Sequence, residues 1–533
     1  MNKLTNKIVL KGALSILFIT GLGFQSFAQK ANWHNLDLKK DSVFGIDTEK
    51  AYTELLKGKK SSPVVVGVLD GGVDINHEDL KRIIWVNKKE KAGNGKDDDK
   101  NGYVDDINGW NFLGSAKGSV NQETLELTRI LRRDKAKFEN VTAATVKPAD
   151  SAAFSQYLKA KIDYEKQTEE AKSAVANIGG LKNVLDAMVK KMGKEKPERA
   201  DFQAFKAENA MEDRLKGIMV SQLQNTTFEA FYNAQIVKGL DHYEDQLKYN
   251  LNLDFDPRPE LVGDNYADSK QKNYGSNDVK GPDASHGTHV AGIIGADRTN
   301  TLGILGVADN VRIMGVRAVP NGDERDKDVA NTIRYAVDNG AKVVNMSFGK
   351  AYSWDKKAVD DAVKYAVSKD VLLVQAAGND NKNLDVEASF PSRRYEDGGI
   401  ASSYIVVGAS GPNDDKTLKA DFSNYGKTTV DVFAPGVQIY STVPDNKYEA
   451  YNGTSMASPV VAGLAALIRS YYPKLSAVQV KEIILKSVVK VNHNVDIEGE
   501  EGTAPQSVPF ADLCITGGIV NAYDALKLAA TYN

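Results

Sequence analysis

The chain has almost no cysteine. Cys514 is the single cysteine among 533 residues, so no disulfide can form within the chain. It lies in the apolar segment ADLCITGG with no histidine close by in the sequence, which favours a small core residue over a nucleophile. Packing, or packing together with metal ions, must therefore supply the stability.

An excess of charge of either sign is also missing. Lysine and arginine number 68 against 71 aspartate and glutamate residues, which gives a formal net charge of -3. No basic cluster stands out from its acidic neighbours, so a nucleic acid is not an expected partner.

Long apolar runs are scarce, and the one notable run lies near the N-terminus. Residues 13–24 are apolar, follow three lysines and precede the small-residue site Ser-Phe-Ala that ends at Ala28. This pattern predicts a signal peptide over residues 1–28, cleaved before Gln29. A membrane anchor is the alternative, but the run is shorter than the roughly 20 residues that a spanning helix needs. We expect an exported protein without a membrane span, in the periplasm or the medium.

Most of the chain alternates short apolar strands with amphipathic helices. Continuous β-branched runs of this kind are typical of a parallel sheet that is covered on both faces. The pattern predicts a doubly wound α/β fold with a mainly parallel sheet and helices on both faces. The expected strands are 64–69, 311–319, 342–348, 371–377 and 404–410, and two of the expected helices are 326–340 and 353–370.

Residues 115–250 differ, because they are rich in Ala, Lys and Glu and poor in strand formers. They predict an all-α subdomain inserted into the α/β unit, with two apolar stripes at helical spacing that should face a core. One stripe consists of Leu181, Val184, Leu185, Met188, Val189 and Met192, and the other of Phe154, Leu158 and Ile162. The expected domains are a signal peptide (1–28), a short N-terminal segment (29–62), a first catalytic part (63–114), the helical insertion (115–250) and a second catalytic part (251–530).

Three segments place chemically active side chains at the ends of predicted elements. Asp70 ends the strand VVVGVL, where doubly wound sheets hold their active sites. His286 starts the small-residue helix SHGTHVAGIIGA, and Ser455 starts the apolar helix in GTSMASPVVAG, beside free N–H groups. Alone, each has an ordinary explanation: a turn aspartate, a metal or core histidine, and a helix-capping serine. His289, three residues beyond His286, is expected to be structural, since no third ligand accompanies the pair.

Taken in order, these segments carry a resemblance. DGGVD at Asp70, HGTHVAG at His286 and GTSMASP around Ser455 resemble the three signature blocks of the subtilisin-like serine proteases, the subtilases. The resemblance covers roughly residues 63–112 and 281–530. It implies that Ser455 attacks the scissile carbonyl, that His286 carries the proton and that Asp70 orients the imidazole. It also implies that Asn379, in QAAGN, binds the oxyanion together with the Ser455 N–H.

The resemblance extends to the substrate cleft. The run NMSFG resembles the family's substrate-pairing strand, and main-chain pairing tolerates many side chains, so broad specificity is expected. The floor of the specificity pocket should come from near Ser389. The implied cleft residues are Ser347, Phe348, Gly349, Ala377 and Gly378.

Structural calcium is expected at two places. The loop 94–110 presents oxygen side chains around a glycine turn, although it lacks the glutamate of an EF-hand, and a solvated acidic turn is the alternative. The family's strong calcium site implies a second set of ligands. The candidate residues are Asp97, Asp99, Asn101 and Asp105 or Asp106 in the loop, and Asp79, Asn300, Leu302 and Ile304 at the second site.

The activity expected from these features is that of a serine endopeptidase on protein or peptide substrates, with no organic cofactor. The insertion between Asp70 and His286 is expected to restrict access to the cleft. A dedicated processing protease with few substrates is one alternative. An inactive subtilase-fold binding protein is another, and four retained chemical groups argue against it.

Overall fold

The computed structural model describes residues 30–499 and 503–532, and the predicted signal peptide lies outside this range. The described chain divides into two compact units, Leu127–Phe255 and a larger unit that combines Lys30–Glu126 with Asp256–Asn533. Each unit is described here by itself.

The larger unit is built on a nine-stranded sheet in the order β12-β15-β9-β8-β7-β6-β1-β5-β2. Every neighbouring pair is parallel except β12 with β15 at one edge. This confirms the predicted doubly wound α/β fold. The strands are β1 (Val64–Asp70), β2 (Gly109–Asn111), β5 (Val311–Arg317), β6 (Val343–Met346), β7 (Leu372–Ala376), β8 (Tyr404–Ser410), β9 (Val432–Pro435), β12 (Val489–Lys490) and β15 (Gly518–Ile519).

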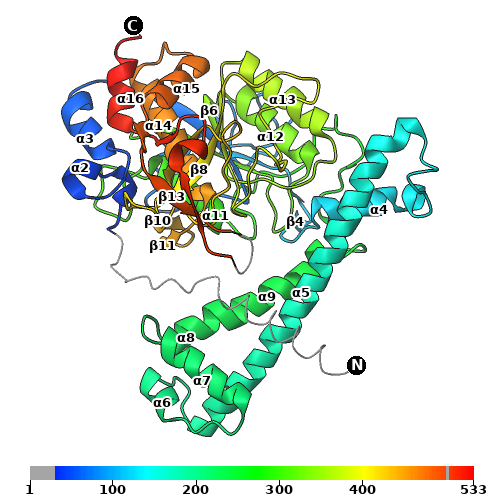
Figure 1. Cartoon of the computed structure of the whole chain (residues 1–533). Helices are drawn as coiled ribbons and strands as arrows, with labels where there is room; N and C mark the ends of the chain where they lie inside the picture. The colour runs from blue at the N-terminus through cyan, green and yellow to red at the C-terminus, as the bar shows by residue number, and fades with distance from the viewer. Residues whose placement is uncertain (1–29, 500–502, 533) are drawn as a thin grey trace. The chain divides into compact units, whose positions relative to one another are not determined.

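Two hydrophobic cores lie on opposite faces of this sheet, because successive strand side chains point to opposite sides. In β7, Leu372 and Val374 belong to one core and Leu373 belongs to the other. Helices α11 and α14 pack in the first core, and α12 and α13 in the second (Figure 1). The helices of this unit are α2 (Leu38–Asp41), α3 (Thr48–Ala51), α10 (Arg258–Leu261), α11 (Ser285–Gly295), α12 (Asp326–Asp338), α13 (Lys356–Ser368), α14 (Thr454–Tyr471), α15 (Ala477–Lys486) and α16 (Ala522–Ala529).

Short antiparallel pairs complete the larger unit. They are β3 (Gly114–Ser115) with β4 (Gly118–Ser119), β10 (Ile439–Val443) with β11 (Lys447–Tyr451), and β13 (Asn494–Ile497) with β14 (Gln506–Pro509).

The segment 30–62 packs onto the larger unit. Trp33 and Ile46 are buried in the core that contains α14, and the indole of Trp33 donates to the Val437 carbonyl at 3.1 Å. The N–H of Ala522 donates to the Ile46 carbonyl, which ties the segment to the start of α16. These residues therefore contribute to the core that supports the sheet.

The regular secondary structure of the unit Leu127–Phe255 consists of helices, as its composition predicts. Its longest element is α5 (Ser151–Met192), and its own core contains Leu185, Met188 and Phe202. The other helices are α4 (Glu126–Phe138, which begins in the larger unit), α6 (Arg199–Ala204), α7 (Ala210–Gln222), α8 (Phe228–Phe231) and α9 (Lys238–Asp245). No helix within residues 30–499 and 503–532 combines the length and apolar character needed to cross a membrane.

One of the two predicted stripes on α5 is wrong. Phe154 is buried, but Leu158 and Ile162 are exposed, with 39% and 64% of their surface accessible. The helix instead turns Phe154 and Tyr157 toward Phe138 of α4, with ring centroids 5.5 and 5.7 Å apart. Since i, i+3 and i, i+4 pairs share a helix face equally well, the sequence pattern alone could not choose between these two faces.

Candidate active site

Three neighbouring strands deliver candidate residues to one edge of the sheet. The strands β7, β6 and β1 lie side by side and run parallel, so their carboxyl ends meet at the same edge. Asp70 is the last residue of β1, Ser347 follows β6, and Asn379 lies just beyond β7. Ligand and active sites of open α/β sheets form at this edge.

Asp70 and His286 form a hydrogen-bonded pair. The Nδ1 atom of His286, at the start of α11, lies 2.8 Å from Oδ1 and 3.0 Å from Oδ2 of Asp70. Gly287 makes this approach possible, because a Cβ there would lie 2.2 Å from the carbonyl oxygen of Gly72. Burial lowers the pKa of His286, but the charge and hydrogen bond of the Asp70 carboxylate, together with the charge of Asp283, raise that pKa above its ordinary value. The pair is thus arranged to stabilise a protonated imidazole.

Ser455 is the second residue of α14, and its side chain is held beside Ser347. Its Oγ donates to the Ser347 carbonyl at 3.0 Å, while the Ser347 hydroxyl donates back to the Ser455 carbonyl at 2.9 Å. Among the described residues, this is the one hydrogen bond that the Ser455 hydroxyl makes. No hydrogen bond joins it to His286 within the described residues.

Asn379 is fixed by the residue that precedes Ser455. Its Oδ1 accepts hydrogen bonds from both the N–H and the hydroxyl of Thr454, each at 2.9 Å. The amide nitrogen therefore faces away from Thr454, and a Cβ on Gly453 would lie 3.5 Å from it. An amide N–H is thus available beside the Ser455 N–H at the start of α14, as oxyanion binding requires.

The predicted cleft residues also lie at this edge. Phe348 and Ala377 are buried, Gly378 has a φ of 101°, and Gly349 faces Ser389, whose Oγ would lie 3.3 Å from a Cβ on Gly349. A cavity of about 490 Å³ opens beside them. Its lining includes Ala377 and Ser389, together with Gln375, Phe390, Thr428 and Thr429.

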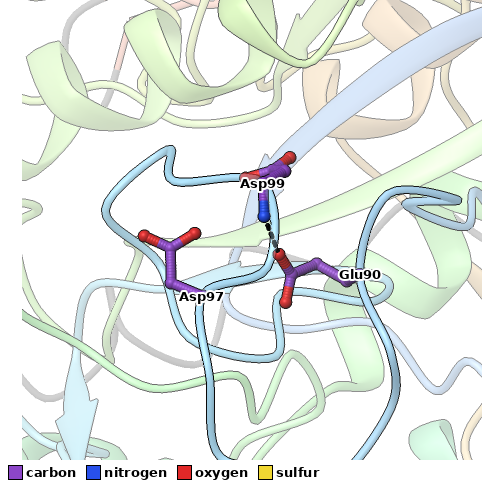
Figure 2. Close-up of side chains that lie close together, drawn as sticks. All are labelled: Glu90, Asp97 and Asp99. Carbon is purple, nitrogen blue, oxygen red and sulfur yellow. Dashed lines mark hydrogen bonds between the residues drawn. The ribbon is translucent and has the colours of Figure 1, made fainter.

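The acidic loop brings three carboxylates together. Oxygen atoms of Glu90, Asp97 and Asp99 lie within 4.8 Å of one another, and Figure 2 shows the side chains around the turn. Glu90 is 8% exposed, and its Oε2 has no hydrogen-bond partner within the described part of the chain. Sequence reasoning missed Glu90, because it precedes the loop 94–110 and does not share its pattern of oxygen side chains.

Asn101 and Asp106 adjoin this cluster, and the Asn101 N–H donates to Asp97 and to Asp99, each at 3.1 Å. The buried Asp106 accepts from the Tyr335 hydroxyl at 2.6 Å and from the Asn101 amide at 3.0 Å. Its neighbour Asp105 accepts from the N–H of Gly95 at 2.8 Å. Asp97 and Asp99 also accept hydrogen bonds, from the Asn101 and Gly102 N–H groups and from the Asn87 amide, so Oε2 of Glu90 is the carboxylate oxygen of the cluster that lacks a partner within the described residues.

The second predicted calcium position is closed by protein hydrogen bonds. Asn300 donates its amide N–H to Oδ1 of Asp79 at 2.7 Å and accepts the Leu302 N–H at 2.9 Å. Ile304 is buried, and its N–H also bonds to Asp79. A cation there would require Asn300 to turn its amide, so this arrangement fits an ion less well than the acidic loop does.

Two other residues have structural surroundings. The buried His289 lies 3.1 Å from the Glu449 carbonyl and stacks on Tyr451 at 4.3 Å between centroids. Cys514 is buried, and burial raises the pKa of its thiol, which disfavours the reactive thiolate.

Comparison with known proteins identifies the same family that the three sequence blocks resemble. The Subtilase family profile matches residues 61–502. A thermophilic serine proteinase of Bacillus sp. (strain AK1) is 46% identical over 35% of this chain and 43% of its own length. Subtilisin DY of Bacillus licheniformis is 41% identical over 37% of this chain and 67% of its own length. Thermitase of Thermoactinomyces vulgaris is 41% identical over 35% of this chain and 61% of its own length. The first of these alignments thus spans less than half of the relative. With most of its length matched by the family profile, the chain belongs to the subtilase family.

Proposed function

We propose that the protein is a serine endopeptidase that uses Asp70, His286 and Ser455. The observation that carries the proposal is the 2.8 Å bond between His286 and Asp70 at the sheet edge where Ser347 holds Ser455. Membership of the subtilase family supports the reaction class.

In the proposed reaction, the Ser455 Oγ turns from the Ser347 carbonyl to Nε2 of His286. It attacks the scissile carbonyl carbon while His286 accepts its proton, and Asp70 stabilises the imidazolium through Nδ1. The oxyanion receives hydrogen bonds from the Asn379 amide and the Ser455 N–H. His286 then returns the proton to the leaving amine, and water hydrolyses the acyl-enzyme by the same steps.

The proposed substrates are extended peptide segments of many sequences. Residues 347–349 continue from β6 beyond its last ladder partner, so their main-chain groups can pair with an extended substrate. The cavity beside Ala377 and Ser389 would accept the side chain before the scissile bond. This supports broad specificity, and a processing protease with few substrates is the second candidate.

Labelling with a fluorophosphonate tests the proposed reaction. The probe reacts with activated serines and should label the wild-type protein but not Ser455→Ala, while Ser470→Ala serves as a control with a buried helical serine outside the site. Absence of both labelling and cleavage of a peptide library by the folded wild-type protein would refute it. Profiling the cleaved library separates broad from dedicated activity.

We also propose that the protein is exported and that residues 115–250 restrict access to the cleft. The support for export is the sequence pattern of residues 1–28, and the support for restricted access is the position of the insertion between Asp70 and His286. N-terminal sequencing of the secreted protein should find Gln29. Deletion of Leu127–Phe255 should raise turnover of folded proteins more than turnover of short peptides, and equal turnover of both would contradict the access role.

Calcium is proposed at the acidic loop. Glu90, Asp97 and Asp99 supply hard carboxylate oxygens, and the unpartnered, buried Oε2 of Glu90 leaves a charge to be neutralised. A bound ion would stabilise the loop structurally. We expect calcium to raise the thermal midpoint of Ser455→Ala protein and this response to disappear in Asp97→Asn/Asp99→Asn, whereas Asp79→Asn should keep it. An unchanged calcium response in the double variant would place the ion elsewhere.

A further inference from the structure

Lys350 directly follows the proposed substrate strand and is buried. Its side chain is 1% exposed, and its ammonium group donates to the Glu324 carbonyl at 2.6 Å. It also pairs with Glu126 at 3.1 Å and Asp326 at 2.8 Å. One side chain therefore joins the residue after Gly349 to the first residues of two helices, α4 and α12.

The main chain of Lys350 holds the wall of the pocket. Its N–H donates to the Phe390 carbonyl and its carbonyl accepts from the Phe390 N–H, both at 2.9 Å. Phe390 follows Ser389; both line the cavity, and the Ser389 Oγ lies next to Gly349, 3.3 Å from where a Cβ on Gly349 would be. The position of Lys350 thus fixes the spacing between the substrate strand and the pocket wall.

The first turn of α12 is anchored from several sides. The Asp326 carboxylate accepts from the Ser353 hydroxyl at 2.6 Å and the Asp355 N–H at 2.7 Å in addition to Lys350. Burial would raise the pKa of Asp326, yet Lys350 together with the hydrogen bonds from Ser353 and Asp355 holds that pKa below its usual value. Lys350 therefore pairs with a carboxylate that other hydrogen bonds hold in place.

Glu126 gives the ammonium group its second anchor. Its Oε1 also accepts the Trp354 N–H at 2.9 Å, so the carboxylate bridges Lys350 and the segment that follows it. Glu126 is the residue at which α4 begins and after which the inserted helical unit starts. A buried ion pair is often no more stabilising than apolar residues of similar size, so stability alone does not account for a lysine here.

We propose that Lys350 is a positioning residue that aligns the substrate strand with the pocket wall. Its ammonium group anchors the strand to Glu126 and α12. Its backbone holds Phe390, and with it the neighbouring Ser389, through two hydrogen bonds. This rests on the proposed peptidase function. Longer substrates, which would pair with residues 347–349, need this alignment, whereas a substrate with one residue before the scissile bond depends mainly on the reacting groups.

The test compares Lys350→Met with a matched control, Lys327→Met. Lys327 is also 1% exposed and follows Asp326 in the first turn of α12. It pairs with Asp264 at 2.7 Å but does not adjoin the substrate strand. For each folded variant, kcat and KM are measured on a tetrapeptide anilide and a single-residue anilide, and the fluorophosphonate labelling rate is recorded.

Lys350→Met should lower kcat/KM for the tetrapeptide by about tenfold relative to the single-residue substrate, because a small misplacement of a paired strand weakens the reactive geometry. Its labelling rate should stay within about twofold of wild type. Lys327→Met should leave the ratio of the two substrates unchanged. Equal ratios in both variants would overturn the proposal, since Lys350 would then contribute to folding alone.

A second variant decides the matter if Lys350→Met does not fold. Glu126→Gln removes the charge that anchors Lys350 and retains an oxygen for the Trp354 N–H. Glu126→Gln should lower the ratio of kcat/KM for the tetrapeptide to that for the single-residue substrate, as Lys350→Met does. Lys350→Arg, which keeps the positive charge, should restore part of this ratio. A wild-type ratio in Glu126→Gln would refute the positioning role. Failure of the wild-type protein to label or cleave would refute the peptidase function itself, which is a separate result.

Discussion

Two buried histidines should cost the protein stability as the pH falls. His34 is fully buried, and burial together with the charges of Arg298 and His289 lowers its pKa to about 3. Burial likewise lowers the pKa of His289 to about 3. Both rings are neutral in the folded chain at pH 5, whereas a histidine in the unfolded chain, with a pKa of about 6.5, is then almost fully protonated. The unfolded state binds more protons, so stability decreases as the pH falls.

The size of this effect follows from proton linkage. Between pH 7 and pH 5, the difference in bound protons lowers the free energy of unfolding by about 2 kcal/mol for each histidine, or about 4 kcal/mol for both. The loss begins near the unfolded pKa and continues toward pH 3. His286 has a raised pKa and acts in the opposite sense, and it is present in every variant compared.

Urea unfolding of Ser455→Ala protein, which cannot digest itself, measures how the free energy of unfolding changes between pH 7 and pH 5. This change is the slope compared below. The double variant His34→Gln/His289→Gln should flatten that slope by about 4 kcal/mol over the interval. His493→Gln is the control: a hydrogen bond to the Asn494 carbonyl and the nearby Asp414 raise the pKa of His493, so its loss should slightly steepen the decline. A double variant with the parental slope would refute the reasoning.

Three further substitutions test the site and its support. Asn379→Ala should lower kcat by about 100- to 1,000-fold with little change in KM, a magnitude already known for an oxyanion asparagine of this family and not worked from this structure. Thr454→Val removes one of two donors to the Asn379 amide oxygen and should lower kcat by about tenfold, so a larger loss than in Asn379→Ala would contradict this role. Asp328→Asn weakens the buried partner of Arg258 and should reduce the free energy of unfolding by about 3 kcal/mol in urea, with an unchanged labelling rate.

The main strands could be predicted because they are continuous β-branched runs, but their ends depend on tertiary contacts. The predicted strand 311–319 stops at Arg317, since the N–H groups of Ala318 and Val319 both bond to the Asp70 carbonyl. The predicted strand 342–348 stops at Met346, and the Ser347 side chain bonds to Ser458 of α14. In both cases a partner distant in sequence takes the chain out of the sheet.

The candidate catalytic residues could be named from local blocks, whereas their supporting contacts could not. Nothing near Asn379 in the sequence indicates that Thr454 orients its amide, and Glu90 does not share the spacing of the acidic loop. The contacts of Lys350 likewise involve residues up to 224 positions away. Such pairings arise only when the sheet and its helices are assembled.

The sequence by itself determined the family resemblance, the α/β class and the helical character of the insertion, because these follow from local motifs and from side-chain periodicity. Only the tertiary structure decided which face of α5 is buried, which carboxylates meet at the loop, and how Lys350 ties the substrate strand to α12. The physical reason is that burial and charge pairing depend on distances between residues remote in the chain, and these distances exist only in the folded molecule.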